Sequence, residues 1–302
     1  MSAGEGTAAG EGMPTRFERL AAGAVWTLES VGLRRLAYSS AFRRLGKALL
    51  LRGGDRPVVR VIPTGLGRGL KLRVLPETPK SYWLGTHEPQ MQAALAAHVR
   101  PGMTVYDCGA NVGYFSVISA RLVGEAGRVY AFEPSPASLE SLRSAVELNG
   151  LANLTVVPKG LWDERETLRF RRGSGGASLV SDHVEGVFGE APGQAQDVEP
   201  EDFVEIEVDS LDNFVYGGGN PPPDFVKLDV EGAEGRALAG ARRLLAEHRP
   251  GLLLEIHGGP GREVWHLLQE FGYTATNIAT GARPRSADEF AVWISQYLAL
   301  PS

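Results

Sequence analysis

The chain has 302 residues, 43% of them hydrophobic, and a formal net charge of −5. This length fits one large α/β domain with an N-terminal addition, and the apolar content excludes a globally disordered chain. The negative charge gives no basic field that would draw the chain to nucleic acid. The single cysteine, Cys108, excludes an internal disulfide and a four-cysteine zinc site, and fits a reducing, cytoplasmic setting.

The first 100 residues differ in pattern from the rest. Residues 1–15 are rich in Gly, Ala and Glu, which predicts a disordered tail. Residues 16–52 repeat apolar positions at helical spacing between mostly basic ones. Such a stretch packs as a helical cap on the main domain or makes weak peripheral contact with an anionic membrane surface. No apolar run is long enough for a transmembrane span.

Short strands are expected within residues 57–75, at Val58–Ile62 and Leu70–Val74. Residues 82–99 then follow a helical pattern, as one helix or two, that stops at Pro101-Gly102. We therefore assign residues 16–100 to an N-terminal cap of helices and short strands.

From residue 103 onward, apolar strands alternate with helices. The expected strands are 103–106, 128–132, 154–157, 225–230, 251–256, 273–278 and 290–295, and the expected helices are 114–123, 136–148, 233–246 and 262–271. This alternation predicts a parallel sheet covered by helices on both faces, so residues 101–302 form an α/β domain of the doubly wound type.

Residues 171–203 interrupt this rhythm. Between Ser174 and Asp212 there are many acidic residues and no Lys or Arg. This composition predicts an acidic insert that forms a loop or lid. Because its charge opposes that of the basic stretch 16–52, we hypothesise that the two approach each other over the active site.

A glycine loop follows the first of these strands. Asp107 ends the strand, and Gly109-Ala110-Asn111-Val112-Gly113 leads into a helix. The spacing G-x-N-x-G departs from the dinucleotide pattern G-x-G-x-x-G, which weighs against the alternative of an NAD-dependent oxidoreductase. A carboxylate at Asp107 would repel a pyrophosphate, whereas it suits the ammonium group of a methionine. The loop therefore favours S-adenosylmethionine as the ligand, with the methionine carboxylate at the helix N-terminus.

Further cofactor contacts are expected at the ends of the next two strands. Glu133, followed by Pro134, can accept hydrogen bonds from the ribose hydroxyls, as in NAD enzymes. Leu161 or Trp162 would face the adenine, with ordinary core packing as the alternative for Trp162, and Asp163 would accept from the exocyclic amine. Upstream, Glu88 can reach the methionine ammonium or lie on a helix surface.

Several motifs together resemble the FkbM family of class I methyltransferases. They are residues 105–115 (VYDCGANVGYF), 130–134 (YAFEP), 208–212 (VDSLD), 226–234 (VKLDVEGAE), 254–257 (LEIH) and 84–88 (LGTHE). The resemblance covers about residues 80–297. It implies a Rossmann-like fold with a seven-stranded, mostly parallel sheet, and O-methylation of a hydroxyl on a small molecule, natural product or sugar. A non-catalytic binding protein of the same fold is the alternative.

Candidate catalytic residues follow two neighbouring strands. Lys227, Asp229 and Glu231 alternate along one strand and so share a side, and Glu255 and His257 are likewise two apart on the next. We expect His257 to be the general base because its ordinary pKa of about 6.5 suits proton uptake near neutral pH. A structural histidine at the strand end is the alternative.

The remaining residues of this set have several roles open to them. Asp229 can orient the acceptor, ligate a metal or touch the cofactor, and Lys227 can pair with Asp229 or Glu255, or lower the pKa of the acceptor hydroxyl. Helix capping is the alternative for Glu231 and the favoured reading for Glu234. Asp229, Glu255 and His257 could together hold Mg²⁺, although we do not favour a metal.

Overall fold

The computed structural model describes residues 11–12, 57–75, 78–171, 179–180, 203–257, 261–290 and 294–302. The expectations for residues 16–52 and for most of the acidic insert lie outside these residues. Within the predicted tail, Glu11–Gly12 form a two-residue strand, β1, that pairs in parallel with β2.

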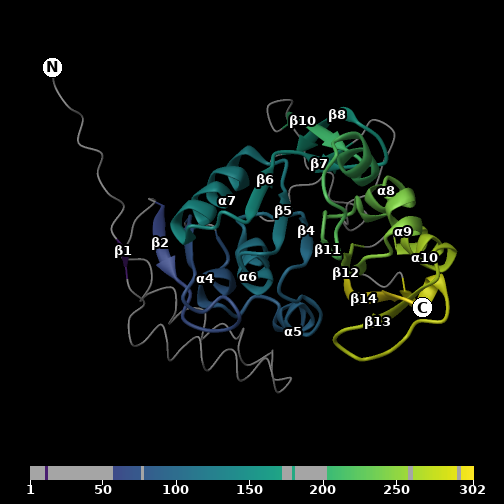
Figure 1. Cartoon of the computed structure of the whole chain (residues 1–302), viewed down its shortest axis with the longest axis horizontal. Coiled ribbons are helices and arrows are strands. Elements are labelled where there is room, and N and C mark those ends of the chain that lie inside the picture. The colour runs from purple at the N-terminus through teal and green to yellow at the C-terminus, as the bar shows by residue number, and fades with distance from the viewer. Residues whose placement is uncertain are drawn as a thin grey trace, which may run out of the picture.

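A seven-stranded sheet forms the centre of the molecule (Figure 1), with the strand order β13-β14-β12-β11-β4-β5-β6. The strands are β4 (Thr104–Cys108), β5 (Arg128–Phe132), β6 (Leu154–Val157), β11 (Phe225–Leu228), β12 (Gly251–Ile256), β13 (Tyr273–Asn277) and β14 (Ser295–Pro301). Only β14 runs antiparallel to its neighbours, which confirms the expected mostly parallel sheet. All residues of β11 are buried, as expected of a strand covered on both faces.

Helices cover both faces of this sheet, as predicted. One core contains residues of α5 (Pro89–His98), α6 (Tyr114–Val123) and α7 (Pro136–Asn149), and the other contains residues of α8 (Glu234–Ala239), α9 (Arg242–Glu247) and α10 (Gly261–Glu270). Side chains alternate between the two cores along each strand: Val105 lies in the first and Tyr106 in the second. Asp107 and Lys227 therefore face the side of α5 and α6.

A second, smaller sheet has the strand order β7-β10-β8-β9 and lies at the top of Figure 1, beside α8. Its strands are β7 (Gly160–Leu161), β8 (Glu166–Arg171), β9 (Leu179–Val180) and β10 (Phe203–Asp209). The sequence analysis missed this sheet, although β10 alternates exposed Glu205 and Glu207 with buried Ile206 and Val208. That period of two marks a half-buried strand, which the acidic composition obscured.

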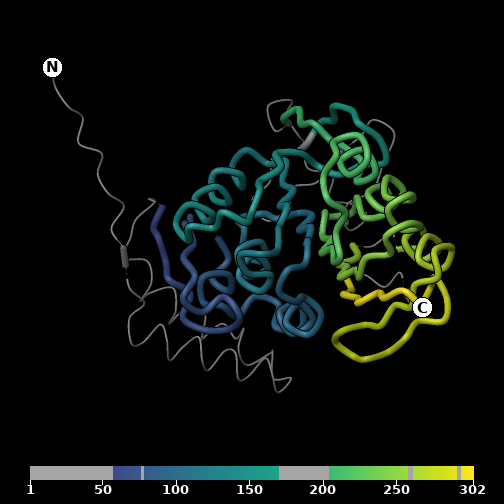
Figure 2. Tube along the Cα trace, viewed as in Figure 1, coloured from purple at the N-terminus to yellow at the C-terminus, as the bar shows by residue number. Residues whose placement is uncertain are grey.

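The two N-terminal strands expected from the sequence are present as β2 (Val58–Val61) and β3 (Lys71–Val74), and they form an antiparallel pair. Figure 2 shows them on the side of the molecule opposite the C-terminus. Gln92, fully buried in α5, joins this region to the loop after α4 (Lys80–Leu84). Its Nε2 donates to the carbonyl of His87 at 2.6 Å, and its Oε1 accepts from the N–H of Leu66 at 2.9 Å. The loop that carries His87 and Glu88 is thus held from both sides.

Two predicted elements are wrong in their bounds. The expected strand 290–295 instead contains the end of helix α11 (Ala287–Phe290), and β14 begins only at Ser295. Phe290 is fully buried and stacks on Tyr297 of β14. The expected helix 233–246 is divided at Gly240, where a Cβ would lie 2.2 Å from the carbonyl oxygen of Trp162. Among the described residues, no helix is long and apolar enough to cross a membrane.

Candidate functional site

The strand order reverses between β4 and β11. The chain passes from β4 outward to β5 and β6, and then returns to the other side of β4 to form β11 and β12. Ligands of doubly wound sheets bind at such a reversal, outside the carboxyl ends of the strands. The glycine loop and the candidate catalytic residues all follow these carboxyl ends, so the fold gathers them at one edge.

Gly109 brings the ends of β4 and β11 into close contact. It adopts a φ of +78°, and a Cβ at this position would lie 1.7 Å from the carbonyl oxygen of Asp229. The Asp229 N–H in turn donates to the carbonyl of Cys108 at 3.1 Å. Glycine is therefore required here by the neighbouring backbone, in addition to any ligand.

Beneath the loop, Lys227 joins two carboxylates in a buried cluster that we call the floor: Asp107, Lys227 and Asp229. Lys227 Nζ lies 3.3 Å from Asp107 Oδ1 and 3.2 Å from Asp229 Oδ2, and donates to the carbonyl of Gly109 at 2.8 Å. Burial opposes the charge of Lys227, but the two carboxylates outweigh it and raise its pKa. Ser116 donates to Asp107 Oδ2, and the side chain of Asp107 is 1% exposed. Its predicted contact with a methionine ammonium stays a prediction.

Glu133 lies at the end of β5, where the sequence places a ribose contact. Its side chain accepts the N–H groups of Asn111 and Ser135, each at 2.8 Å. Burial raises its pKa to about 7, against the effect of these two N–H donors. Asn111 has a φ of 50°, and Gly113, with a φ of 90°, caps α6. The carboxyl of Glu133 thus fixes the loop through both of its oxygens, and its contact with a ribose stays a prediction.

The expected adenine contacts lie in the second sheet or beside it. Leu161 in β7 is 1% exposed, and Trp162 packs in a small core with Ala233 and residues of β8 and β10. Asp163 Oδ2 accepts from Arg236 Nη1 at 2.7 Å. Gly160 approaches Pro134, which links this segment to the end of β5. The adenine contact stays a prediction, and Asp163 already has a partner.

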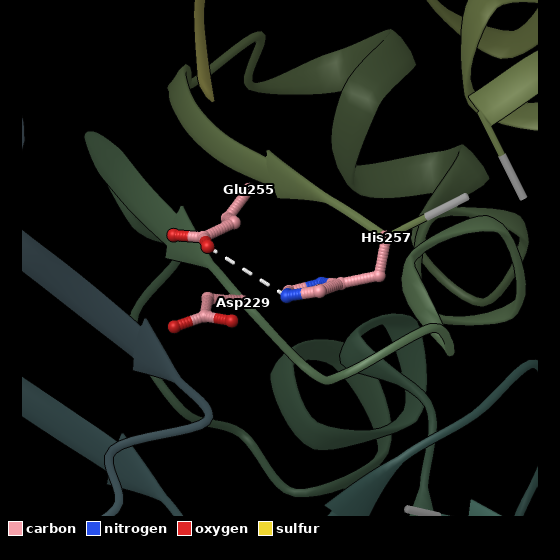
Figure 3. Close-up of side chains that lie close together, drawn as sticks. All are labelled: Asp229, Glu255 and His257. Atoms are coloured by element: carbon pink, nitrogen blue, oxygen red, sulfur yellow. Dashed lines mark ion pairs between the residues drawn. The ribbon is translucent and has the colours of Figure 1, made fainter. Parts of the chain in front are cut away.

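At the opening of the site, Asp229, Glu255 and His257 converge (Figure 3), and their nearest ligand-type atoms lie within 4.8 Å of one another. His257 Nε2 lies 3.6 Å from Glu255 Oε1, and Nδ1 lies 3.0 Å from Glu234 Oε1. Burial lowers the pKa of His257, but the hydrogen bond and charge of Glu234 outweigh it and raise the pKa to about 9. The expectation that His257 is the general base rested on the ordinary pKa of a histidine, and that pKa does not apply to His257 when no ligand is bound.

Two further carboxyls of this opening also have displaced pKa values. Burial and the charge of Asp229 raise the pKa of Glu231 to about 7. Burial and the charges of Glu255 and Asp229 raise that of Glu88 to about 9, and its Oε2 is buried without a hydrogen-bond partner. Glu231 and Glu88 both adopt positive φ angles, of 53° and 42°. Such backbone strain gathers at functional sites. We call Glu88, Glu231, Glu255 and His257 the rim.

The cluster of Asp229, Glu255 and His257 offers three ligand-type atoms within 4.8 Å of one another, the arrangement for which the sequence suggested Mg²⁺ as the less favoured possibility. Asp229 is already paired with Lys227 at 3.2 Å. We therefore derive no step through a metal ion.

An aromatic group near the rim was missed by the sequence analysis. Tyr82 and His87 stack with ring centroids 3.9 Å apart, and His87 lies 5.7 Å from the ring of Phe115. Burial lowers the pKa of His87 to about 4, so this ring is neutral at physiological pH. Burial and the charge of Asp229 raise the pKa of Tyr82. The signal was present in the run 84–88, where Gly85 turns the chain back after α4.

Comparisons with known proteins find one matching family model and several methyltransferases. The model of the methyltransferase FkbM domain matches residues 107–275. The chain is 26% identical, over 58% of its own length and 74% of the relative's, to the 31-O-demethyl-FK506 methyltransferase FkbM of Streptomyces tacrolimicus. It is 30% identical, over 55% and 61%, to the hexuronic acid methyltransferase AglP of Haloferax volcanii. A solved FkbM methyltransferase from Methylobacillus flagellatus aligns with a TM-score of 0.39 and 22% identity, over 65% of this chain and 43% of that one.

Proposed function

The chain belongs to the FkbM methyltransferase family, and from that premise we propose that it methylates a hydroxyl oxygen with S-adenosylmethionine as donor. The acceptor is a small molecule, natural product or glycan. The observation that carries this proposal is the convergence of Asp229, Glu255 and His257 beside the glycine loop at the strand reversal. The family match leaves the oxidoreductase alternative without support.

The residues of the donor side suit this cofactor in charge and shape. The floor and rim hold more carboxylates than cations, and the donor brings an ammonium group and a sulfonium. Glu88, with its unpartnered buried oxygen, is suited to the ammonium, and Glu133 to the ribose hydroxyls. The free N–H groups at the start of α6 suit the methionine carboxylate. The segment 161–163 remains our assignment for the adenine.

The acceptor side has to align an oxygen with the methyl group and remove its proton. When bound, S-adenosylmethionine supplies a methyl carbon on a positively charged sulfur. A cation placed in this cluster disfavours the charged form of His257 and so lowers its pKa toward the working pH. Asp229 and Glu255, beside His257 in Figure 3, are placed to orient a hydroxyl group. This gives His257 the role of general base and these two carboxylates the role of positioning the acceptor.

The class of acceptor is suggested by the relatives and by charge. The two curated relatives are named for an FK506 precursor and for a hexuronic acid, both of which offer hydroxyl groups. In the described part of the site, Lys227 pairs with Asp107 and Asp229, and His257 lies among Glu231, Glu234 and Glu255. The feature that we propose for the acceptor is therefore its hydroxyl group and not a particular charge.

Titration calorimetry of the full chain with S-adenosylmethionine and S-adenosylhomocysteine tests the donor assignment, and binding of both is expected. Transfer of a labelled methyl group to hydroxylated acceptors, followed by identification of the methylated atom, tests the reaction. Binding without transfer to any acceptor would favour the non-catalytic alternative. Binding of neither ligand would defeat the proposal.

A further inference from the structure

Glu234 is the most deeply buried carboxylate near the rim. It is the first residue of α8, its side chain is fully buried, and its Oε1 accepts the N–H of Gly232 at 2.9 Å. Gly232 precedes Ala233, the N-cap of α8, so this bond fixes the turn before the helix, and only the position of the acid in the first turn corresponds to the capping role expected from the sequence. The same Oε1 lies 3.0 Å from Nδ1 of His257, a contact that capping does not require.

Capping alone does not account for this burial. Carboxylates at helix N-termini function at the protein surface, and removing a charged carboxylate from water costs several kcal/mol unless a partner compensates. For Glu234 the compensating group is His257, because Gly232 offers only a neutral N–H. The second oxygen, Oε2, has no hydrogen-bond partner, so the side chain depends on its Oε1 contacts.

The two nitrogens of His257 therefore meet different surroundings. Nδ1 faces one fixed and buried acceptor, Glu234. Nε2 lies 3.5 Å from Glu231 Oε2 and 3.6 Å from Glu255 Oε1, beyond normal hydrogen-bond length, on the side that Figure 3 shows turned toward Asp229 and Glu255. The imidazole is thus anchored at one nitrogen and open at the other.

We propose that Glu234 is a positioning residue that holds the proton on Nδ1 of His257, so that Nε2 is the nitrogen that gives up its proton and faces the acceptor hydroxyl. This inference rests on the proposed function for the role of Nε2, while the geometry of the pair stands independently. The partner on one ring nitrogen decides which nitrogen carries the proton in the neutral ring. Glu234 accordingly sets which atom of His257 acts as base.

Four carboxylates from three elements face His257. Glu234 comes from α8, Asp229 and Glu231 from the loop after β11, and Glu255 from β12. All four favour the charged ring, but Glu234 alone combines full burial with hydrogen-bond distance. A positive ligand that offsets the other three leaves the Nδ1 contact in place. The charged ring of His257 then loses its proton from Nε2.

The test is long-range proton–nitrogen NMR of the histidine rings in the full chain, with a pH titration. The signals of His257 are identified by their loss in His257→Gln. In the wild type, Nε2 should lose its proton as the pH rises while Nδ1 keeps it. In Glu234→Gln, the amide oxygen can still accept from Nδ1 but the charge is lost, so the titration midpoint of His257 should fall by roughly one unit or more.

Glu263→Gln is the matched control, because the exposed Glu263 reaches the same start of α8 at Gly235 without contacting His257. It should leave the tautomer and the titration midpoint of His257 unchanged. Loss of the proton from Nδ1 in the wild type, or an unchanged titration midpoint of His257 in Glu234→Gln, would overturn the inference. If Glu234→Gln does not fold, the wild-type titration still decides. Failure to bind S-adenosylhomocysteine would instead count against the proposed function alone.

Discussion

The floor and the rim of the site use the same residue types in opposite ways. In the floor, Lys227 is 3.3 Å and 3.2 Å from the carboxylates of Asp107 and Asp229, so the buried charges satisfy one another. In the rim, Glu88, Glu231 and Glu255 face one another, and their pKa values are all raised. The difference indicates that the charges of the floor stabilise the fold, whereas the like charges of the rim cost stability, as we expect of the residues that we propose to meet a positively charged ligand.

The largest expected effect is the loss of the cation from the floor. Lys227→Met leaves the fully buried Asp107 and the partly exposed Asp229 without a counter-charge, so it should lower the free energy of unfolding by about 3–5 kcal/mol. Urea denaturation at neutral pH measures this. Arg262→Met is the control, because the pair of Arg262 with Asp288 is exposed and should be worth about 1 kcal/mol or less. Equal losses of unfolding free energy in the two variants would contradict the distinction between the buried floor and an exposed ion pair.

The second effect comes from the contact between β4 and β11. Gly109→Ala places a Cβ 1.7 Å from the carbonyl oxygen of Asp229, so the backbone has to move. Gly124→Ala has a similar positive φ but no atom within 4 Å of the added Cβ. The control should cost about 1 kcal/mol from its backbone conformation, and Gly109→Ala at least about 2 kcal/mol more. Thermal unfolding of the two variants side by side measures the difference, and similar melting temperatures would contradict it.

A rim substitution should have the opposite sign. The pKa of Glu88 is raised from 4.5 to about 9, so this carboxyl costs stability once the pH exceeds its unfolded value. Glu88→Gln removes that cost and should stabilise the chain by about 1–3 kcal/mol at pH 8, with little effect at pH 4.5. The same variant should bind S-adenosylmethionine more weakly. If Glu88→Gln were less stable than the wild type at pH 8, the carboxyl of Glu88 would stabilise the fold, as the charges of the floor do.

The smallest expected effect is the pH dependence contributed by His257. Its pKa is raised from 6.5 to about 9, so its contribution to stability is fully present below about pH 6.5 and is lost as the pH rises through about 9. The stability difference between the wild type and His257→Gln should therefore be about 1–2 kcal/mol larger at pH 6 than at pH 9.5. Denaturation series at the two pH values measure it. A constant difference would mean that His257 is not charged in the folded chain.

The fold was largely predictable because its central strands are short apolar runs between helices with regular spacing. The expected bounds of β5, β6, β12 and α6 agree with the structure. The small second sheet was not predicted, because the strand 203–209 alternates Glu with apolar residues beside an acidic segment and was read as part of it. The acidic composition of this segment concealed the alternation of exposed and buried residues that marks a strand.

The sequence predicts which residues form the candidate site, but it does not predict which of them contact one another. The position of Asp107 and Lys227 at strand ends follows from the sequence, but their pairing depends on the register of β4 against β11. The contact between Glu234 and His257 joins the first residue of α8 to the residue that follows β12, and no local pattern encodes it. The raised pKa of His257 follows from that contact, so the sequence alone suggested an ordinary value.

The central claim is that the donor binds at the edge formed by the glycine loop and Glu133, above an internally neutralised floor. Hydrogen exchange of the full chain with and without S-adenosylhomocysteine tests it most directly. We predict increased protection in peptides that cover residues 107–116 and 129–136. Unchanged exchange in both segments under saturating ligand, or protection confined to other parts of the chain, would contradict the account.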